Sequence, residues 1–309
     1  MEDISQPNCY KVLDELRESC EIPVWHDDAQ GTASVTLAGL LNGLHLAGKK
    51  LSEAKIVFLG AGASNTTIAR LILADGGRGE NMIMFDTKGS LHAGRKDIEG
   101  DVRLYRKWEL CRQTNPRRVE GEAEAIRGAD VLIALSRPGP ETVKREWVRS
   151  MGSKAIVFAC ANPVPEIWPY AAKEEGAYIV ATGRGDFPNQ VNNSVCFPGI
   201  LKGALAVRAR KITDRMAIRC AHSLADFARA RGIGPENIVA TMEETEVFAV
   251  EAADVAMEAI AEGVARVKAS WQEVHDKALG DIRASREMTK DLMAAGHIKE
   301  PPRGMLEAL

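Results

Sequence analysis

Five short runs of apolar residues recur between residues 55 and 181, and enough chain separates each run from the next to form a helix. A run that is apolar at every position is typical of a strand buried on both faces, and such strands need a crossover to pair in parallel. The spacing therefore predicts an α/β fold, a doubly wound parallel sheet of the Rossmann type, followed by a C-terminal helical region. The predicted strands span residues 55–59, 81–85, 130–134, 155–159 and 178–181.

Past residue 203 the strand pattern stops and apolar residues recur at helical spacing. One stripe predicts a helix that begins after Thr213 as its N-cap and carries Met216, Cys220, Leu224 and Phe227 on one face. A second stripe alternates steps of three and four residues and predicts another helix face, made of Met257, Ile260, Val264, Val267 and Trp271.

Composition excludes several classes of protein. The 309 residues hold 40 Lys and Arg against 43 Asp and Glu, so the net charge of −3 leaves no electrostatic footprint for nucleic acid. No apolar run approaches the roughly 18 residues of a membrane span, and the N-terminus is acidic where a signal peptide is basic. We therefore expect a cytoplasmic protein without a nucleic-acid or membrane partner. The six cysteines form no CxxC pair, which favours buried free thiols over a zinc site or disulfides.

A glycine-rich turn, Gly60-Ala61-Gly62-Ala63-Ser64-Asn65, follows the first predicted strand, and Asp86 closes the next one. In a dinucleotide fingerprint the first glycine makes a tight turn, the second admits the pyrophosphate, and the acidic residue faces the ribose. Asn65 replaces the third glycine, which serves helix–strand packing, so the match is weaker there. The competing interpretation is a tight strand-to-helix turn that binds no nucleotide.

A second cluster, residues 25–33, contains His26, Asp27 and Asp28 just before a helix expected over residues 32–47. Adjacent carboxylates at this junction fit a helix cap or a metal site equally well. Three carboxylates drawn from Glu2, Asp3, Asp27 and Asp28 would suit a hard cation such as Mg²⁺ or Mn²⁺. We expect His26 to be a packed or hydrogen-bonded residue rather than a ligand.

Two segments rich in asparagine follow predicted strands, where ligand-binding loops of such sheets lie. One is Asn162-Pro163, and the other runs from Asn189 to Asn193. Neutral amides at these places can orient a carboxylate or a ribose, although turns also favour Asn, Gly and Pro. Composition leaves both interpretations open.

Taken together, these segments resemble the malic enzyme family, whose members oxidise malate with a nicotinamide cofactor and decarboxylate the product to pyruvate. The resemblance covers nearly the whole chain, and its motifs occur in one order. They are Glu2-Asp3-Ile4, His26-Asp27-Asp28 through Gly31-Thr32-Ala33, Gly60-Ala61-Gly62-Ala63, Asp86-Thr87-Lys88-Gly89, Ser136-Arg137-Pro138-Gly139, Ala161-Asn162-Pro163, and Gly185-Asp186-Phe187-Pro188-Asn189-Gln190-Val191-Asn192-Asn193 through Phe197-Pro198-Gly199.

The resemblance implies roles for single residues. Glu2, Asp3 and Asp28 match ligands of Mg²⁺ or Mn²⁺. The implied catalytic residues are Asp27, an acid beside that metal, and the amides Asn162 and Asn193. The implied dinucleotide-binding residues are Gly60, Gly62, Ala63, Ser64, Asp86, Thr87, Asn162 and Asn192. We expect residues 29–193 to form the dinucleotide-binding domain, and residues 1–28 and 194–309 to form a mainly helical region for substrate, metal and oligomer contacts.

The family normally carries a tyrosine acid and a lysine base in a region before its Glu-Asp pair, whereas this sequence begins at that pair. General acid–base groups typically contribute about 10² to 10⁴-fold each. We therefore expect a chain that binds dinucleotide but oxidises malate slowly, unless a separate chain supplies these groups. The alternatives are a non-catalytic dinucleotide-binding subunit for regulation or assembly, and a malolactic-type enzyme.

Three further expectations concern ligands and assembly. Asp86 predicts NAD in preference to NADP, because its carboxylate would repel a 2′-phosphate, although Lys88, Arg95 and Lys96 oppose that preference. The expected substrate is malate, oxaloacetate or pyruvate. At least a homodimer is expected, because a helix near residues 9–18 has little to pack on and an amphipathic stretch continues to Met293.

Overall fold

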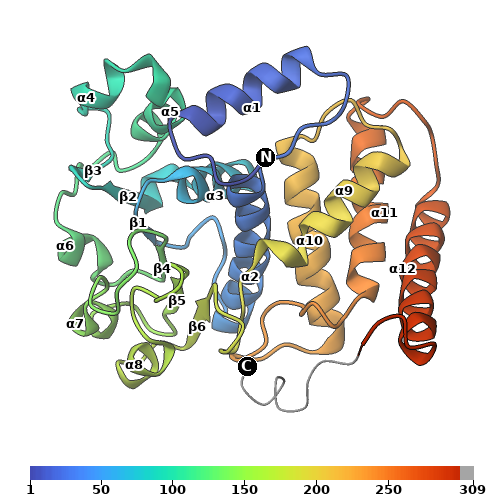
Figure 1. Ribbon diagram of the computed structural model, residues 1–309. Helices are drawn as coiled ribbons and strands as arrows, with labels where there is room; N and C mark the ends of the chain where they lie inside the picture. Colours follow the sequence, from blue (N-terminus) through green and yellow to red (C-terminus); the bar gives the residue numbers. More distant parts are fainter. Residues whose placement is uncertain (300–309) are drawn as a thin grey trace.

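The fold was analysed in a computed structural model that describes residues 1–299. Within these residues one sheet has the strand order β3-β2-β1-β4-β5-β6 (Figure 1). The five parallel strands lie at the five predicted apolar runs, so the predicted doubly wound α/β fold is confirmed. They are β1 (Ile56–Leu59), β2 (Met82–Asp86), β4 (Val131–Ala134), β5 (Ile156–Ala159) and β6 (Ile179–Thr182). The sequence did not predict β3 (Gly89–Ser90), a short antiparallel strand at the edge.

Both faces of the sheet are covered by helices, which explains the continuous apolar runs. In β1, Ile56 and Phe58 belong to one hydrophobic cluster, and Val57 and Leu59 belong to another. The first cluster includes residues of α2 (Thr32–Ala47), α3 (Ala63–Ala74), α4 (Lys96–Glu99) and α5 (Tyr105–Gln113). The second includes residues of α6 (Glu122–Ile126), α7 (Arg145–Arg149) and α8 (Pro169–Glu174).

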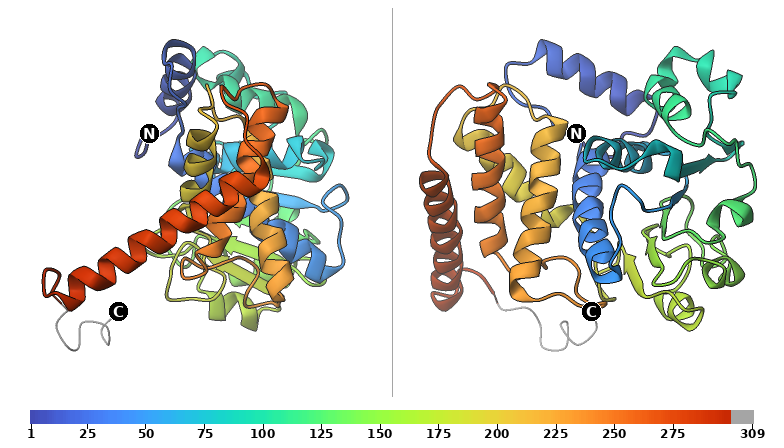
Figure 2. Two further views of the ribbon diagram at one scale, coloured as in Figure 1. Left: turned by 90° about the vertical axis from the view of Figure 1, so that its right-hand side faces the viewer. Right: turned by 180° about the vertical axis from the view of Figure 1, so that it is seen from behind.

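The C-terminal region is helical, as predicted, and it packs beside the sheet rather than apart from it. Its helices are α9 (Phe197–Ala206), α10 (Asp214–Arg231), α11 (Glu246–Ala261) and α12 (Trp271–Ala294). The helix α2 lies between the sheet and these helices in both the front and back views (Figures 1 and 2). Phe58 of the sheet, Leu37 of α2 and Leu224 of α10 share one buried cluster. The division at residues 29–193 stays a prediction.

The first C-terminal stripe is confirmed and the second is wrong as a single helix face. Thr213 caps α10 by accepting a hydrogen bond from the Met216 backbone N–H at 3.1 Å. The residues of the second stripe instead fall on α11, on the connection after it and on α12. The helix α11 ends because Gly263 adopts a positive φ of 71° and the Val264 N–H bonds back to the Ala259 carbonyl.

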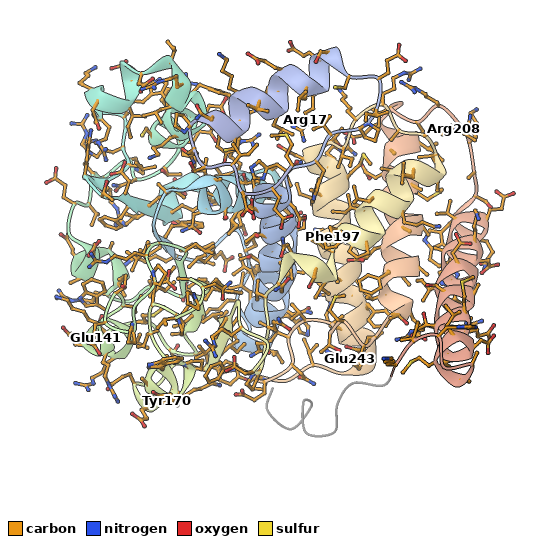
Figure 3. All side chains as sticks on the ribbon, in the orientation of Figure 1. Arg17, Glu141, Tyr170, Phe197, Arg208 and Glu243 are labelled. Carbon is orange, nitrogen blue, oxygen red and sulfur yellow. The ribbon has the colours of Figure 1, made fainter. Side chains whose placement is uncertain are left out.

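The expectation that the first helix has little to pack on is also wrong. This helix, α1 (Asn8–Ser19), buries Cys9, Tyr10 and Leu13 within the chain. The Arg17 guanidinium donates to the Ile212 carbonyl at 2.9 Å, and Figure 3 shows Arg17 where α1 meets the helical region. The short helices are η1 (Asp27–Gly31), η2 (Gly79–Asn81), η3 (Val102–Leu104) and η4 (Asn193–Val195).

All six cysteines are free and five of them are buried, as predicted. Every helix in residues 1–299 is too short or too polar to cross a bilayer.

Candidate functional site

The candidate site begins where β1 ends at the middle of the sheet. Gly60 follows β1 with a φ of +94°, and a Cβ there would lie 2.4 Å from the Leu135 carbonyl oxygen. Only glycine fits this turn without moving the backbone after β4. Because β2 and β4 flank β1, this turn lies at the point where an open parallel sheet forms its ligand crevice.

Gly62, the N-cap of α3, has a different environment from Gly60. Among residues 1–299, no atom lies within 4 Å of a Cβ placed on Gly62, and no side chain caps this helix end. The helix therefore presents backbone N–H groups to open space, which is the arrangement that binds phosphate. This opening fits a dinucleotide pyrophosphate.

A cavity of about 670 Å³ lies along this edge, within the size range of small-molecule sites. Its lining comes from the loops after β1, β2 and β4, with additions from α5 and α6. These residues include Gly60, Gly62, Asp86, Thr87, Lys107, Ser136 and Arg137.

At the end of β2, Asp86 accepts charged hydrogen bonds from more than one cation. Arg95 binds both carboxylate oxygens at 3.0 and 3.1 Å, and Lys107 lies 3.4 Å from Oδ2. The Lys88 backbone N–H donates to Oδ1 at 2.9 Å. Burial alone would raise the pKa of Asp86, but these bonds and charges outweigh it and hold the pKa below its usual value.

Asp27 and Asn193 are 166 positions apart in sequence and form a hydrogen-bonded pair. Asn193 donates to Asp27 Oδ2, and the Trp25 indole N–H donates to Oδ1 at 2.9 Å. A Cβ on Gly31 would lie 2.4 Å from Asp27 Oδ1 and 3.0 Å from Asn193 Cβ, so glycine permits this approach. The structure thus brings together two of the three predicted catalytic residues.

Two of the predicted metal ligands lie beside each other. The Asp3 backbone N–H donates to Asp28 Oδ2 at 2.7 Å, while the side chain of Glu2 is exposed. Across residues 1–299 no three His, Cys, Asp or Glu side chains are grouped to hold an ion. The oxygen donors suit a hard cation in kind, but their arrangement does not form a preformed site.

His26 is buried and hydrogen-bonded, as predicted. Its Nδ1 accepts the Ala29 N–H at 3.3 Å, so its Nε2 donates to the Ile4 carbonyl at 3.1 Å. This imidazole attaches the first residues of the chain to the acidic loop, which contains Asp27 and Asp28.

The dinucleotide turn contacts the acidic loop directly. The Ser64 hydroxyl donates to the Asp28 carbonyl at 2.8 Å. Tyr10 donates to the Ala63 carbonyl at 2.7 Å, and Gln6 donates to Thr66 Oγ1 at 2.8 Å. Hence the start of α3 is held between the predicted cofactor edge and the predicted acidic site.

The remaining asparagines have different surroundings. Asn162 is exposed, and its amide nitrogen would lie 3.0 Å from a Cβ on Gly183. Asn192 caps η4 through the Ser194 N–H at 2.9 Å. Asn189 is buried and bonds to the Val180 and Pro235 carbonyls, so it has a structural role. Ligand contacts by Asn162 and Asn192 stay predictions.

The sequence analysis placed Ser136 in a family motif without a role, and it missed Lys107 in the cavity wall and the carboxylate of Glu166, which bonds to Ser136. Lys107 lies on α5 and 21 positions from Asp86, so no local motif joins the two. Glu166 follows the Asn162-Pro163 motif at a short interval, and a carboxylate in an otherwise apolar segment was the available signal.

Tyr10 and Tyr105 form hydrogen bonds away from the Asp27–Asn193 pair. Tyr10 donates to the Ala63 carbonyl, and Tyr105 donates to Asp14. In the part of the chain that the structure describes, no tyrosine or lysine side chain forms a hydrogen bond with Asp27, Asn162 or Asn193.

Comparisons with known proteins agree on one family. Residues 29–261 match the family model "Malic enzyme, NAD binding domain". An NADP-dependent malic enzyme of Halomonas elongata is 42% identical over 281 residues, which cover 86% of this chain and 64% of that protein. A bifunctional malic/malolactic enzyme of Bacillus subtilis is 41% identical over 278 residues, covering 90% of this chain and 66% of that protein.

A solved structure extends the similarity to the fold. The crystal structure of Entamoeba histolytica malic enzyme matches with a TM-score of 0.97 and 64% identity, covering 99% of this chain and 63% of that one. The chain thus spans slightly less than two thirds of the length of these three relatives.

Proposed function

The chain belongs to the malic enzyme family, and on that basis we propose that it takes part in NAD(P)-dependent oxidative decarboxylation of malate to pyruvate. The observation that carries this proposal is the Ser64–Asp28 contact, which joins the dinucleotide turn to the acidic loop at 2.8 Å. A redox cofactor on the turn would then lie beside a loop whose carboxylates can accept a hydrogen bond from the hydroxyl group of malate.

The chain's own residues have distinct proposed roles. A bound dinucleotide would supply the hydride acceptor for C2 of malate. The N–H groups that begin α3 would hold its pyrophosphate, with Gly62 leaving room for it. Asp27, fixed by Trp25 and Asn193, would accept a hydrogen bond from the substrate, and Asn162 would orient a substrate carboxylate without adding charge.

The choice between NAD and NADP depends on the surroundings of Asp86. Arg95, Lys107 and the Lys88 N–H already occupy its oxygens, so it is poorly placed to select NAD by binding ribose hydroxyls. Lys96 pairs with Glu99 instead of with this group. We propose that either dinucleotide binds, and that a 2′-phosphate would compete with Asp86 for Arg95 and Lys107.

We also propose that Asp28, with Glu2 and Asp3, binds Mg²⁺ or Mn²⁺ by drawing its carboxylates together around the ion. No reaction step is assigned to this ion. Titration with Mn²⁺, followed by electron paramagnetic resonance, should show one site that Asp28→Asn removes. Equal Mn²⁺ binding by the variant would show that Asp28 is not a ligand of the ion.

A second candidate function is the malolactic reaction, because the Bacillus subtilis relative is named as a bifunctional malic/malolactic enzyme. Such a reaction would convert malate to lactate with no net change of the dinucleotide. Product analysis distinguishes the two functions, since pyruvate with reduced dinucleotide supports the first and lactate supports the second.

The 309-residue polypeptide should bind dinucleotide and oxidise malate only slowly, because no tyrosine or lysine of its described part is bonded into the Asp27–Asn193 pair. The test is to titrate NADH and NADPH, and then to assay malate oxidation and oxaloacetate decarboxylation with Mn²⁺ present. A chain that binds neither dinucleotide would contradict the proposed function. Rapid malate oxidation would instead show that the acid and base lie among its own residues.

A further inference from the structure

Glu166 is a fully buried carboxylate that lies behind the cofactor cavity, with 0% of its surface exposed. Its Oε1 accepts the Ser136 backbone N–H at 2.8 Å, and the Ser136 hydroxyl lies 3.4 Å from the same oxygen. Its Oε2 accepts the Ala161 backbone N–H at 3.0 Å. Both carboxylate oxygens are therefore used to hold backbone.

The two backbone amides belong to different loops of the site. Ser136 follows β4 and lines the cavity, whereas Ala161 follows β5 and immediately precedes Asn162. The main chain of the same segment adds two contacts, because the Val143 N–H donates to the Glu166 carbonyl at 2.9 Å and the Gly139 N–H to the Val164 carbonyl at 3.3 Å. Glu166 thus connects both ends of the loop after β4 to the loop after β5.

A carboxylate is a costly side chain at this place. Burial raises the pKa of Glu166, and the N–H donors of Ser136 and Ala161 oppose that shift. Within residues 1–299 no Lys, Arg or His forms an ion pair with Glu166. A carboxylate is nevertheless the group that accepts from two separate N–H donors with two equivalent oxygens, whereas a glutamine would turn an NH₂ toward one of them.

The sheet order indicates which part of a dinucleotide these loops would contact. Asp86, at the end of β2, lies on one side of β1, and the β4 and β5 loops lie on the other. A dinucleotide across this crevice places its adenosine toward β2 and its nicotinamide toward β4 and β5. We infer that Glu166 is a positioning residue that fixes the walls around the nicotinamide half, an inference that rests on the proposed function.

The test compares Glu166→Gln with wild type and with Glu174→Gln, a control at an exposed carboxylate of α8 that pairs with Arg145. Each protein is titrated with NADPH, NADH and ADP, which carries only the adenosine half. Glu166→Gln should weaken binding of the dinucleotides by about 10- to 100-fold, as expected for lost hydrogen bonds to a charged group, while ADP binding changes less than about twofold. The control should match wild type for all three ligands.

Several outcomes would overturn the inference. Equal weakening of ADP and dinucleotide binding would show a general structural role, and unchanged dinucleotide binding would show that the loops hold without Glu166. If Glu166→Gln fails to fold, Glu166→Asp, which keeps the charge on a shorter stem, should show the same selective loss at smaller size. Failure of wild type to bind any dinucleotide would overturn the proposed function itself, a result distinct from a loss confined to the variants.

Discussion

Asn65 occupies the position where a dinucleotide fingerprint has its third glycine, and the structure shows what the amide does there. The side chain is buried, and its Nδ2 donates to the Leu59 carbonyl at 3.0 Å and to the Gly60 carbonyl at 2.9 Å. The amide therefore joins the first turn of α3 to the end of β1. Close helix–strand packing, which glycine supplies by its small size, is supplied here by hydrogen bonds.

Replacing Asn65 with Ala should destabilise the fold by about 1–3 kcal/mol, because the half-buried Gly60 carbonyl loses a donor. Urea unfolding measures this change. Asn65→Asp is the matched variant, since it keeps the shape but removes both donors and buries a charge, and it should cost more than Ala. If Ala is as stable as wild type, the amide does not hold the turn.

Asp86 is the residue whose environment the sequence described least well, because Lys107 and the bidentate Arg95 contact depend on tertiary structure. Three cations, Arg95, Lys107 and Lys88, surround Asp86 and Asp97. The end of β2 is therefore not as negative as an isolated acidic residue there would suggest. This difference bears on how the site treats a 2′-phosphate.

Asp86→Asn should free Arg95 and Lys107 for a phosphate and raise the affinity for NADPH relative to NADH by about tenfold, or about 1.4 kcal/mol. Fluorescence titration of both reduced dinucleotides gives the ratio. Lys107→Met should move the ratio in the opposite direction. A ratio unaffected by either change would place the 2′-position away from this cluster.

At the scale of elements, the sequence predicted the strands and helices that a local apolar pattern determines. It failed for the packing that depends on contacts between distant residues. The five parallel strands and α2 were predictable because burial on both faces makes apolar runs. Local signals also mark the boundary between α11 and α12, namely Gly263 and the Ser270–Glu273 capping box. The apolar stripe that continues across this boundary nevertheless suggested one helix. The packing of α1 depends on Tyr10 reaching Ala63, 53 positions away, so no local pattern could show it.

One contact between elements should make stability depend on pH. His222 on α10 lies 2.8 Å from Asp75, which ends α3. The hydrogen bond that His222 donates to the Asp75 carboxylate raises the pKa of His222 despite burial, with Asp226 adding to the rise and Arg219 opposing it. Because the folded pKa lies above the unfolded value of about 6.5, the stabilisation is complete below about pH 6.5 and is lost as pH rises through the folded pKa.

Urea unfolding of wild type and His222→Gln at several pH values tests this contact. The wild type should be more stable by a few tenths to about 1 kcal/mol at pH 6, since the pair is partly exposed, and the difference should shrink by pH 8.5. A difference that stays constant with pH would mean that the imidazole contributes by packing alone.

At the scale of the whole molecule, the sheet and the C-terminal helices share one hydrophobic cluster that includes Phe58, Leu37 and Val255. The family match over residues 29–261 likewise continues past the predicted boundary at residue 193. The helix α2 contacts α3, which covers the sheet, and α10 of the C-terminal region. The site at the N-terminus of α2 is therefore fixed relative to both the sheet and the C-terminal helices. Asp27 and Asn193 can therefore form a pair although they come from the two regions that the sequence separates.

The outer half of α12 carries apolar side chains on the surface of the molecule. Val274 and Ala278 are buried, and the same helix stripe continues through Met288 and Leu292, which are 63% and 38% exposed. Residues 283–299 are exposed throughout, and α12 extends away from the body in the side view (Figure 2). These exposed apolar side chains form a surface that a partner could cover.

We expect a homodimer in which this stripe is covered, because most oligomers of one chain are two-fold symmetric and pair the same surface of each copy. Sedimentation should show a dimer at micromolar concentration, and the double change Met288→Glu with Leu292→Glu should shift it to the 33.5 kDa species. Glu287→Gln, on the neighbouring face of α12, should leave the dimer intact. A wild type that remains a monomer at high micromolar concentration would contradict the dimer, and a dimer that survives the double change would place its interface elsewhere.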